Sequence, residues 1–206
     1  MDKTVKTIEG YNRCAGEFVA KHMDLGIYEQ FVREFSNCLK EGSTILDLGC
    51  GPGNIVKFLV NQDKGYKILG VDLSPKMLKI ARQNVPTEQF IIGDIRHLQM
   101  ERKFDAVIVS FCMIHLNDDE AIGLLGKTYD LLNAKGYLYL SFMSGGTPGF
   151  DKASFSDKEM YFNYFSPAKI EKELLNLGYA IISKHFHEYR GKLGQVIQDV
   201  IIIVNK

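Results

Sequence analysis

Five short apolar segments constrain the fold of this chain most strongly. They cover residues 44–48, 67–71, 89–92, 105–110 and 137–143, and helical patterns separate them. Apolar residues at successive positions are typical of strands buried on both faces of a parallel sheet. The alternation therefore predicts an α/β protein with a doubly wound sheet and helices on both faces.

Helix start signals lie between these segments. Residues 74–75 and 166–167 are Ser-Pro pairs, which supply an N-cap and a proline at the first helical position. Asn117 and Glu120 have the spacing of a capping box. These signals predict that helices begin at the three positions.

The two ends of the chain have different patterns. Residues 4–22 and 26–40 are predicted to form two helices. Residues 179–188 and 195–204 are predicted to form an antiparallel pair of strands joined by YRGKLG, whose glycines suit a hairpin.

A glycine-rich turn follows the first strand. In ILDLGCGPG, Gly49, Gly51 and Gly53 occupy alternate positions. Glycines at a strand-to-helix turn let a ligand approach the backbone, and the helix N-terminus favours a negatively charged group. The third glycine comes one residue earlier than in the dinucleotide fingerprint G-x-G-x-x-G, so the spacing alone does not identify the ligand.

Three carboxylates mark the ends of consecutive strands. Asp47, Asp72 and Asp94 are predicted to line one edge of the sheet. A carboxylate after the second strand can accept hydrogen bonds from a ribose diol, and one after the third could accept from an exocyclic amine. The alternative for each is capping of a strand end. Their joint placement favours a nucleoside-containing ligand.

Five motifs together resemble a known family. They are ILDLGCGPG, GVDLSPKML, GDIRHL, FDAVIVSFCMIHL and LLNAKGYLYLSF. They resemble the successive motifs of class I S-adenosylmethionine-dependent methyltransferases, from about residue 40 to the C-terminus. Within this family, the motifs resemble those of small-molecule methyltransferases of the ubiquinone/menaquinone-biosynthesis-like group. The resemblance implies a Rossmann-like, seven-stranded sheet, mostly parallel with the last strand antiparallel.

The resemblance also implies the cofactor, S-adenosyl-L-methionine, with S-adenosyl-L-homocysteine as the product. Asp47 would lie beside the methionine ammonium, Asp72 would bind the ribose hydroxyls, and Asp94 would accept the adenine amine. The full set of implied cofactor residues is Tyr11, Asp47, Gly49, Gly51, Gly53, Asp72, Leu73, Met77, Asp94, Ile95 and Ser110.

The resemblance divides the chain into an N-terminal helical cap, residues 1–40, and a cofactor-binding methyltransferase domain, residues 41–206. Tyr11 and Arg13 lie in the helix that closes over the cofactor in this family, with ordinary helix packing as the alternative. The aromatic-rich segment 150–165 would wall the acceptor site or form a satellite core under a long loop.

His115 follows the fourth strand and is the candidate catalytic residue, as a base or an acceptor-binding group. Tyr161 and Tyr164 are weaker candidates. The alternative for His115 is a packing role. A sulfonium is already an activated electrophile, so the expected reaction is in-line displacement at an O, N or C atom of a small molecule.

Several classes of protein are disfavoured. Lys plus Arg and Asp plus Glu both total 25, so the net charge gives no support for nucleic-acid binding. The Ser-Phe-Cys-Met sequence at 110–113 lacks the N/D-P-P-Y pattern of amide and adenine methyltransferases. The four cysteines have no C-x-x-C spacing, so neither a metal site nor a disulfide is expected.

No signal peptide or membrane span is apparent in the sequence, which predicts a cytoplasmic protein without a membrane partner. A monomer or homodimer is expected. Two other functions stay open at this point. One is an S-adenosylmethionine-binding sensor or scaffold without catalysis, and the other is a nicotinamide-dependent oxidoreductase.

Overall fold

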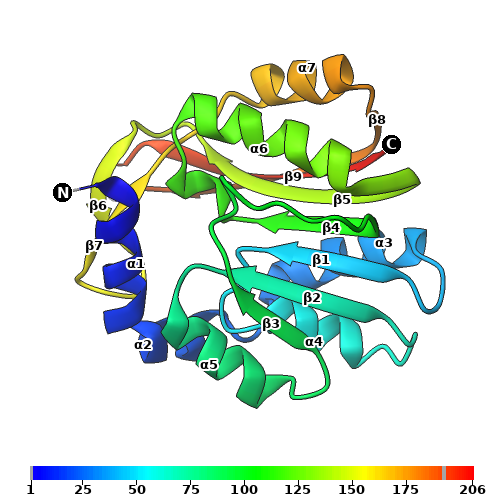
Figure 1. The fold of residues 1–206 in the computed structure, drawn as a ribbon. Helices are drawn as coiled ribbons and strands as arrows, with labels where there is room; N and C mark the ends of the chain where they lie inside the picture. The colour runs from blue at the N-terminus through cyan, green and yellow to red at the C-terminus, as the bar shows by residue number, and fades with distance from the viewer. Residues whose placement is uncertain (1, 192–193) are drawn as a thin grey trace.

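The structure is a computed structural model that describes residues 2–191 and 194–206. In this part of the chain, a seven-stranded sheet with the order β3-β2-β1-β4-β5-β9-β8 forms the centre (Figure 1). β9 is antiparallel to both of its neighbours and the other strands are parallel, which confirms the predicted fold class. The bounds are β1 Thr44–Leu48, β2 Lys67–Asp72, β3 Gln89–Ile92, β4 Phe104–Ser110, β5 Leu132–Ser144, β8 Ala180–Arg190 and β9 Val196–Asn205.

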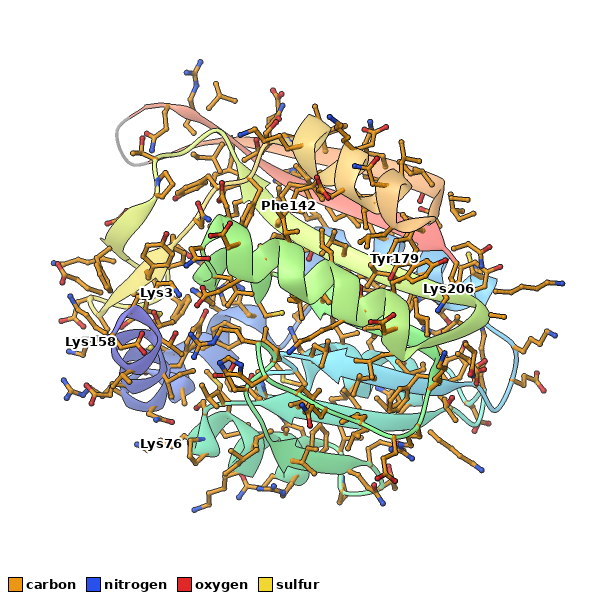
Figure 2. The ribbon with its side chains drawn as sticks, turned by 45° about the horizontal axis from the view of Figure 1, so that its top comes forward. Lys3, Lys76, Phe142, Lys158, Tyr179 and Lys206 are labelled. Atoms are coloured by element: carbon orange, nitrogen blue, oxygen red, sulfur yellow. The ribbon has the colours of Figure 1, made fainter. Side chains whose placement is uncertain are left out.

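Helices cover both faces of the sheet. α3 (Glu29–Cys38), α4 (Asn54–Val60) and α5 (Pro75–Asn84) pack on one face. α6 (Asp118–Leu131) and α7 (Pro167–Leu177) pack on the other, where Figure 2 shows Phe142 and Tyr179 beside them. Each face therefore buries its own apolar layer, as expected from strands with apolar residues at successive positions.

The predicted helix starts are confirmed. Ser74 is the N-cap of α5, and its Oγ accepts a hydrogen bond from the Met77 N–H at 3.2 Å. Asn117 and Glu120 form a reciprocal capping box at the start of α6. These local hydrogen bonds satisfy N–H groups that have no partner inside the helix.

The N-terminal prediction is wrong in its details. The helix predicted over 4–22 is two helices, α1 (Lys3–Arg13) and α2 (Ala15–His22), which meet at Cys14 with φ −117° and ψ 27°. Cys14 is fully buried in a small core, and this packing directs α2 toward the glycine turn, where the Asn54 side chain donates to the His22 carbonyl.

The second predicted helix also begins differently. A 3₁₀ turn, η1 (Gly26–Tyr28), precedes α3. Gly26 has φ +53°, a left-handed conformation that suits glycine and prevents a continuous α-helix from residue 26.

The segment 150–165 contains an unpredicted antiparallel hairpin, β6 (Gly149–Lys152) and β7 (Glu159–Phe162). Met160 is fully buried and packs in a satellite core with Cys14 and Ala153. The Tyr161 N–H donates to Thr7 Oγ1 at 3.1 Å, so the hairpin is bound to α1. Figure 1 shows α1, β6 and β7 together at one side of the sheet.

The C-terminal strands confirm the predicted antiparallel pair, although residues 192–193 of the YRGKLG connection lie outside the described residues. Among the described helices, none is long and apolar enough to cross a bilayer.

Candidate active site

A cavity of about 590 Å³ lies at the carboxyl ends of the central strands, where doubly wound sheets bind ligands. α1, α2, η1 and the hairpin segment supply its other walls. All but one of the predicted cofactor residues line the cavity, and His115 lines it too. Those lining residues are Tyr11, Asp47, Gly49, Gly51, Asp72, Leu73, Met77, Asp94, Ile95 and Ser110.

The first two glycines of the turn have different surroundings. A Cβ on Gly49 would lie 2.3 Å from Cys112 Cβ, so close packing excludes a side chain there. A Cβ on Gly51 would find no atom nearer than Phe18 Cε1 at 3.9 Å. Both residues have positive φ. Gly51 therefore presents bare backbone to open space, whereas Gly49 allows the turn to pack against the end of β4.

Gly53 is the predicted cofactor residue that does not line the cavity. It is the N-cap of α4, with φ +78°. A Cβ there would lie 3.4 Å from Ala81 Cβ and 3.5 Å from Phe90 Cζ. The structure therefore gives Gly53 a packing position behind the turn.

Arg13 is also placed outside the cavity. Its side chain is exposed, and Nη2 lies 3.8 Å from the Glu9 carboxylate one helical turn away. The structure therefore places Arg13 on the exposed surface of α1, outside the cavity.

Backbone amides hold the Asp72 carboxylate in place. Oδ2 accepts from the Gly51 N–H at 2.9 Å and Oδ1 accepts from the Ser74 N–H at 2.8 Å. Burial raises the pKa of Asp72, and these hydrogen bonds act in the opposite direction. Each oxygen keeps a further lone pair, so the group can accept hydrogen bonds from a ligand.

Asp47 is a buried carboxyl group at the cavity wall. The residue is 2% exposed, and none of the described residues donates a hydrogen bond to its carboxyl group. Burial, together with the negative charge of Asp72, raises the pKa of Asp47 to about 8. A buried carboxyl group in this state favours a cation beside it, because a cation stabilises the ionised form.

Asp94 is already paired with a cation. Arg96 Nη2 lies 2.7 Å from Oδ2, and Nε lies 3.0 Å from Oδ1. Arg96 also contacts Glu120, which in turn pairs with Lys3 of α1, a residue labelled in Figure 2. Burial acts to raise the pKa of Asp94, but the hydrogen bonds and charge of Arg96 prevail and lower it. The predicted hydrogen bond from the adenine amine would use the lone pairs of Asp94 that Arg96 leaves free.

His115 is buried between two oxygen atoms. Its Nδ1 lies 2.7 Å from the Tyr161 carbonyl oxygen and its Nε2 lies 2.9 Å from the Tyr11 hydroxyl. Because a carbonyl only accepts, Nδ1 carries the proton and Nε2 accepts from Tyr11. Burial lowers the pKa of His115 to about 4, so the ring is neutral at pH 7. A direct role as base requires Tyr11 to turn away.

A second group of polar residues lies at the β9 side of the cavity and was not predicted. The Tyr28 hydroxyl donates to Asp199 Oδ2 at 2.5 Å, and the Tyr189 hydroxyl lies 3.4 Å from Oδ1. Burial raises the pKa of Asp199. The signal in the sequence was a single acidic residue inside the apolar run VIQDVIIIVN.

Comparison with known proteins also points to methyltransferases. Residues 45–136 match the family model described as a methyltransferase domain. An uncharacterized methyltransferase of Alkaliphilus oremlandii is 25% identical over 161 residues, which cover 73% of each chain. A trans-aconitate 2-methyltransferase of Enterobacter sp. is 38% identical over 100 residues, but the match covers 48% of this chain and only 39% of that enzyme.

The fold has close counterparts among solved structures. A SAM-dependent methyltransferase from Methanosarcina mazei superimposes with a TM-score of 0.71 at 18% sequence identity, over 84% of this chain and 96% of that one. The ubiquinone/menaquinone-like grouping stays a prediction. These matches support the predicted family: residues 45–136 match a methyltransferase domain, and the fold is that of an S-adenosylmethionine-dependent methyltransferase.

Proposed function

We propose that this protein transfers a methyl group from S-adenosylmethionine to a small molecule bound in the cavity. One observation carries the proposal. The Asp47 carboxyl group is buried without a hydrogen-bond donor among the described residues, and it lies in the same cavity wall as the bare backbone of Gly51. The carboxyl group suits a ligand with a cationic end. The bare backbone of Gly51 suits a ligand that approaches the main chain closely.

S-adenosylmethionine, when bound, supplies a methyl group on a positively charged sulfur, and its amino group is a second cation. Asp47 would hold the amino group, and the fixed carboxylate of Asp72 would accept from the ribose hydroxyls. Leu73 and Met77 would pack beside the adenine, since both line the cavity next to Asp72.

The N-terminal helices would exclude water from the reacting groups. Tyr11 and Phe18 line the cavity from α1 and α2, and Phe155 closes against both rings at centroid distances of 6.0 and 5.0 Å. Residues 1–40 would therefore act as a cap together with the hairpin segment. His115 would position the Tyr11 hydroxyl at the cavity wall, and a proton on the acceptor could reach that pair.

The test is a methyl-transfer assay. The purified protein is incubated with S-adenosylmethionine labelled in its methyl group and with a small-molecule extract, and labelled products are separated by mass. We expect label in a small molecule, together with S-adenosylhomocysteine. Tight binding of S-adenosylhomocysteine without any labelled product would favour the sensor or scaffold, whereas binding of NADH instead would favour the oxidoreductase.

A further inference from the structure

The cavity has a further carboxyl group, Asp199, on the side away from Asp47 and Asp72. Asp199 lies on β9, and side chains alternate between the faces of a strand. Ile201 and Ile203 share its face and pack in the same layer as Ile45 of β1. Asp47 and Asp199 therefore lie on one face of the sheet, with β4 and β5 between their strands. Three strand spacings separate them, roughly 14 Å.

Asp199 is a buried carboxyl group without an ion-pair partner among the described residues. Its side chain is 5% exposed, and no Lys, Arg or His among the described residues forms an ion pair with it. Its hydrogen-bond partners are the two phenols of Tyr28 and Tyr189, and the second contact is long for a bond between oxygens. A phenol carries no positive charge, so it does not neutralise a carboxylate. A cation that enters the cavity would therefore stabilise the ionised form of Asp199.

His187 is the basic side chain whose charge acts on this carboxyl group, and it lowers the pKa of Asp199 against the larger effect of burial. It pairs with Asp199 across the β8–β9 register, and its ring stacks on Tyr189 with centroids 6.2 Å apart. The ring does not lie within ion-pair distance of Asp199 and does not line the cavity. His187 therefore leaves the cavity side of the carboxylate open.

The wall around Asp199 is aromatic. The rings of Tyr28 and Phe111 meet edge to face with centroids 5.4 Å apart, and both line the cavity with Met143 and Tyr189. Aromatic faces attract cations, and they do so more strongly when water is excluded. The wall therefore adds to the attraction that the carboxylate exerts on positive charge.

The lysine and arginine side chains of the described cavity wall are already engaged. Lys21 donates to the Ser154 carbonyl at 3.0 Å, and Arg96 is bound to Asp94 and Glu120. An anionic acceptor would find no unengaged Lys or Arg among these described lining residues. The charge of the site therefore selects against carboxylates and phosphates.

We propose that the methyl acceptor carries a cationic nitrogen group, such as an ammonium or amidinium, which Asp199 binds against the aromatic wall of Tyr28 and Phe111. This inference rests on the proposed function, since it names the acceptor class of the same cavity. Asp199 acts as a specificity-determining residue: it accepts hydrogen bonds from the nitrogen with the lone pairs that the phenols leave free.

The experiment compares three probes that differ in one end group. Phenethylamine, 2-phenylethanol and 3-phenylpropanoate are titrated into the protein by calorimetry, with and without S-adenosylhomocysteine. We expect the amine to bind most tightly and the carboxylate most weakly. Asp199→Asn should weaken amine binding about ten- to a hundredfold, as expected for loss of a charge-assisted hydrogen bond, and should leave the alcohol within a few-fold.

Asp130→Asn is the matched control, because it removes the same charge from an exposed position on α6, outside the cavity. It should leave all three affinities unchanged. Equal binding of amine and alcohol, failure of the amine to bind, or an amine affinity that survives Asp199→Asn overturns the proposal. The order of the three affinities in the wild-type protein tests the proposal even if Asp199→Asn does not fold.

The same titrations separate this inference from the proposed function. S-adenosylhomocysteine should bind to Asp199→Asn with unchanged affinity. If S-adenosylhomocysteine binds to neither protein, the proposed function fails, while the ranking of the probes without it still tests Asp199.

Discussion

The Tyr11 hydroxyl donates a hydrogen bond to Nε2 of His115 across 2.9 Å, and the His115 ring donates from Nδ1 to the Tyr161 carbonyl. One buried side chain thus joins α1 to β7 through the turn η2 (Met113–His115), which follows β4. These contacts connect the predicted cap to the sheet at the cavity wall.

Removal of the Tyr11 hydroxyl should destabilise the protein. Tyr11→Phe leaves the Nε2 lone pair of His115 buried without a donor, which costs about 1–3 kcal/mol in the free energy of unfolding. Urea denaturation measures this change. Tyr161→Phe is the control, because only the backbone carbonyl of Tyr161 takes part in the link. Equal effects of the two variants would show that the hydroxyl contact contributes nothing specific.

The stability that depends on His115 should disappear in acid. Its pKa is about 4 in the folded protein and about 6.5 in an unfolded chain. The unfolded chain therefore binds more protons between these values, so the contribution is complete above pH 6.5 and is lost as the pH falls through 4. The difference amounts to roughly 3 kcal/mol.

His115→Gln isolates this contribution, since buried carboxyl groups with raised pKa values, such as Asp47, have the opposite pH dependence. The free energy of unfolding of the wild type, minus that of the variant, should rise between pH 4 and 6.5. A difference that does not change with pH would contradict the neutral, buried ring.

Gly49 and Gly51, which both belong to the glycine turn, should respond differently to alanine. Gly49→Ala brings a Cβ to 2.3 Å from Cys112 Cβ, so it should destabilise the fold beyond the ~1–2 kcal/mol cost of a left-handed residue. Gly51→Ala meets only that cost, but its methyl group enters the space proposed for the cofactor. Thermal melts and titration with S-adenosylhomocysteine should therefore separate a stability defect from a binding defect. The same defect in both variants would argue against this division.

Much of the fold follows from local patterns. The strands of the parallel sheet, the Ser74 cap and the Asn117–Glu120 capping box depend on residues close together in the chain. The carboxylates Asp47 and Asp72 reach the cavity because parallel strands end at the same edge of the sheet.

Other features depend on contacts between distant residues. The β6–β7 hairpin has four-residue strands, and its position depends on α1, where a Cβ on Gly10 would lie 3.0 Å from the Met160 side chain. Asp199 meets Tyr28 only because η1 lies over the end of β9. The hydrophobic periodicity of the sequence predicts neither contact. The Asp94–Arg96 pair is local, and the sequence GDIRHL contained that signal.

Binding of the cofactor product should release a proton from Asp47. Its pKa of about 8 leaves the free carboxyl group largely protonated at pH 7, and an ammonium beside it favours the ionised form. The affinity for S-adenosylhomocysteine should therefore rise with pH until about pH 8. Calorimetry at pH 7 in phosphate and in Tris should give different observed enthalpies. Asp47→Asn should abolish the difference, and identical enthalpies for the wild type would contradict this protonation state.

Titration of the protein with S-adenosylhomocysteine, for the wild type, Asp72→Ala and the control Asp130→Asn, tests the assignment of the cavity most directly. We predict saturable binding to one site that Asp72→Ala weakens by about 1–3 kcal/mol, the range for losing charge-assisted hydrogen bonds, while the control is unchanged. No binding to the wild type, or an unchanged affinity in a folded Asp72→Ala protein, would contradict the account.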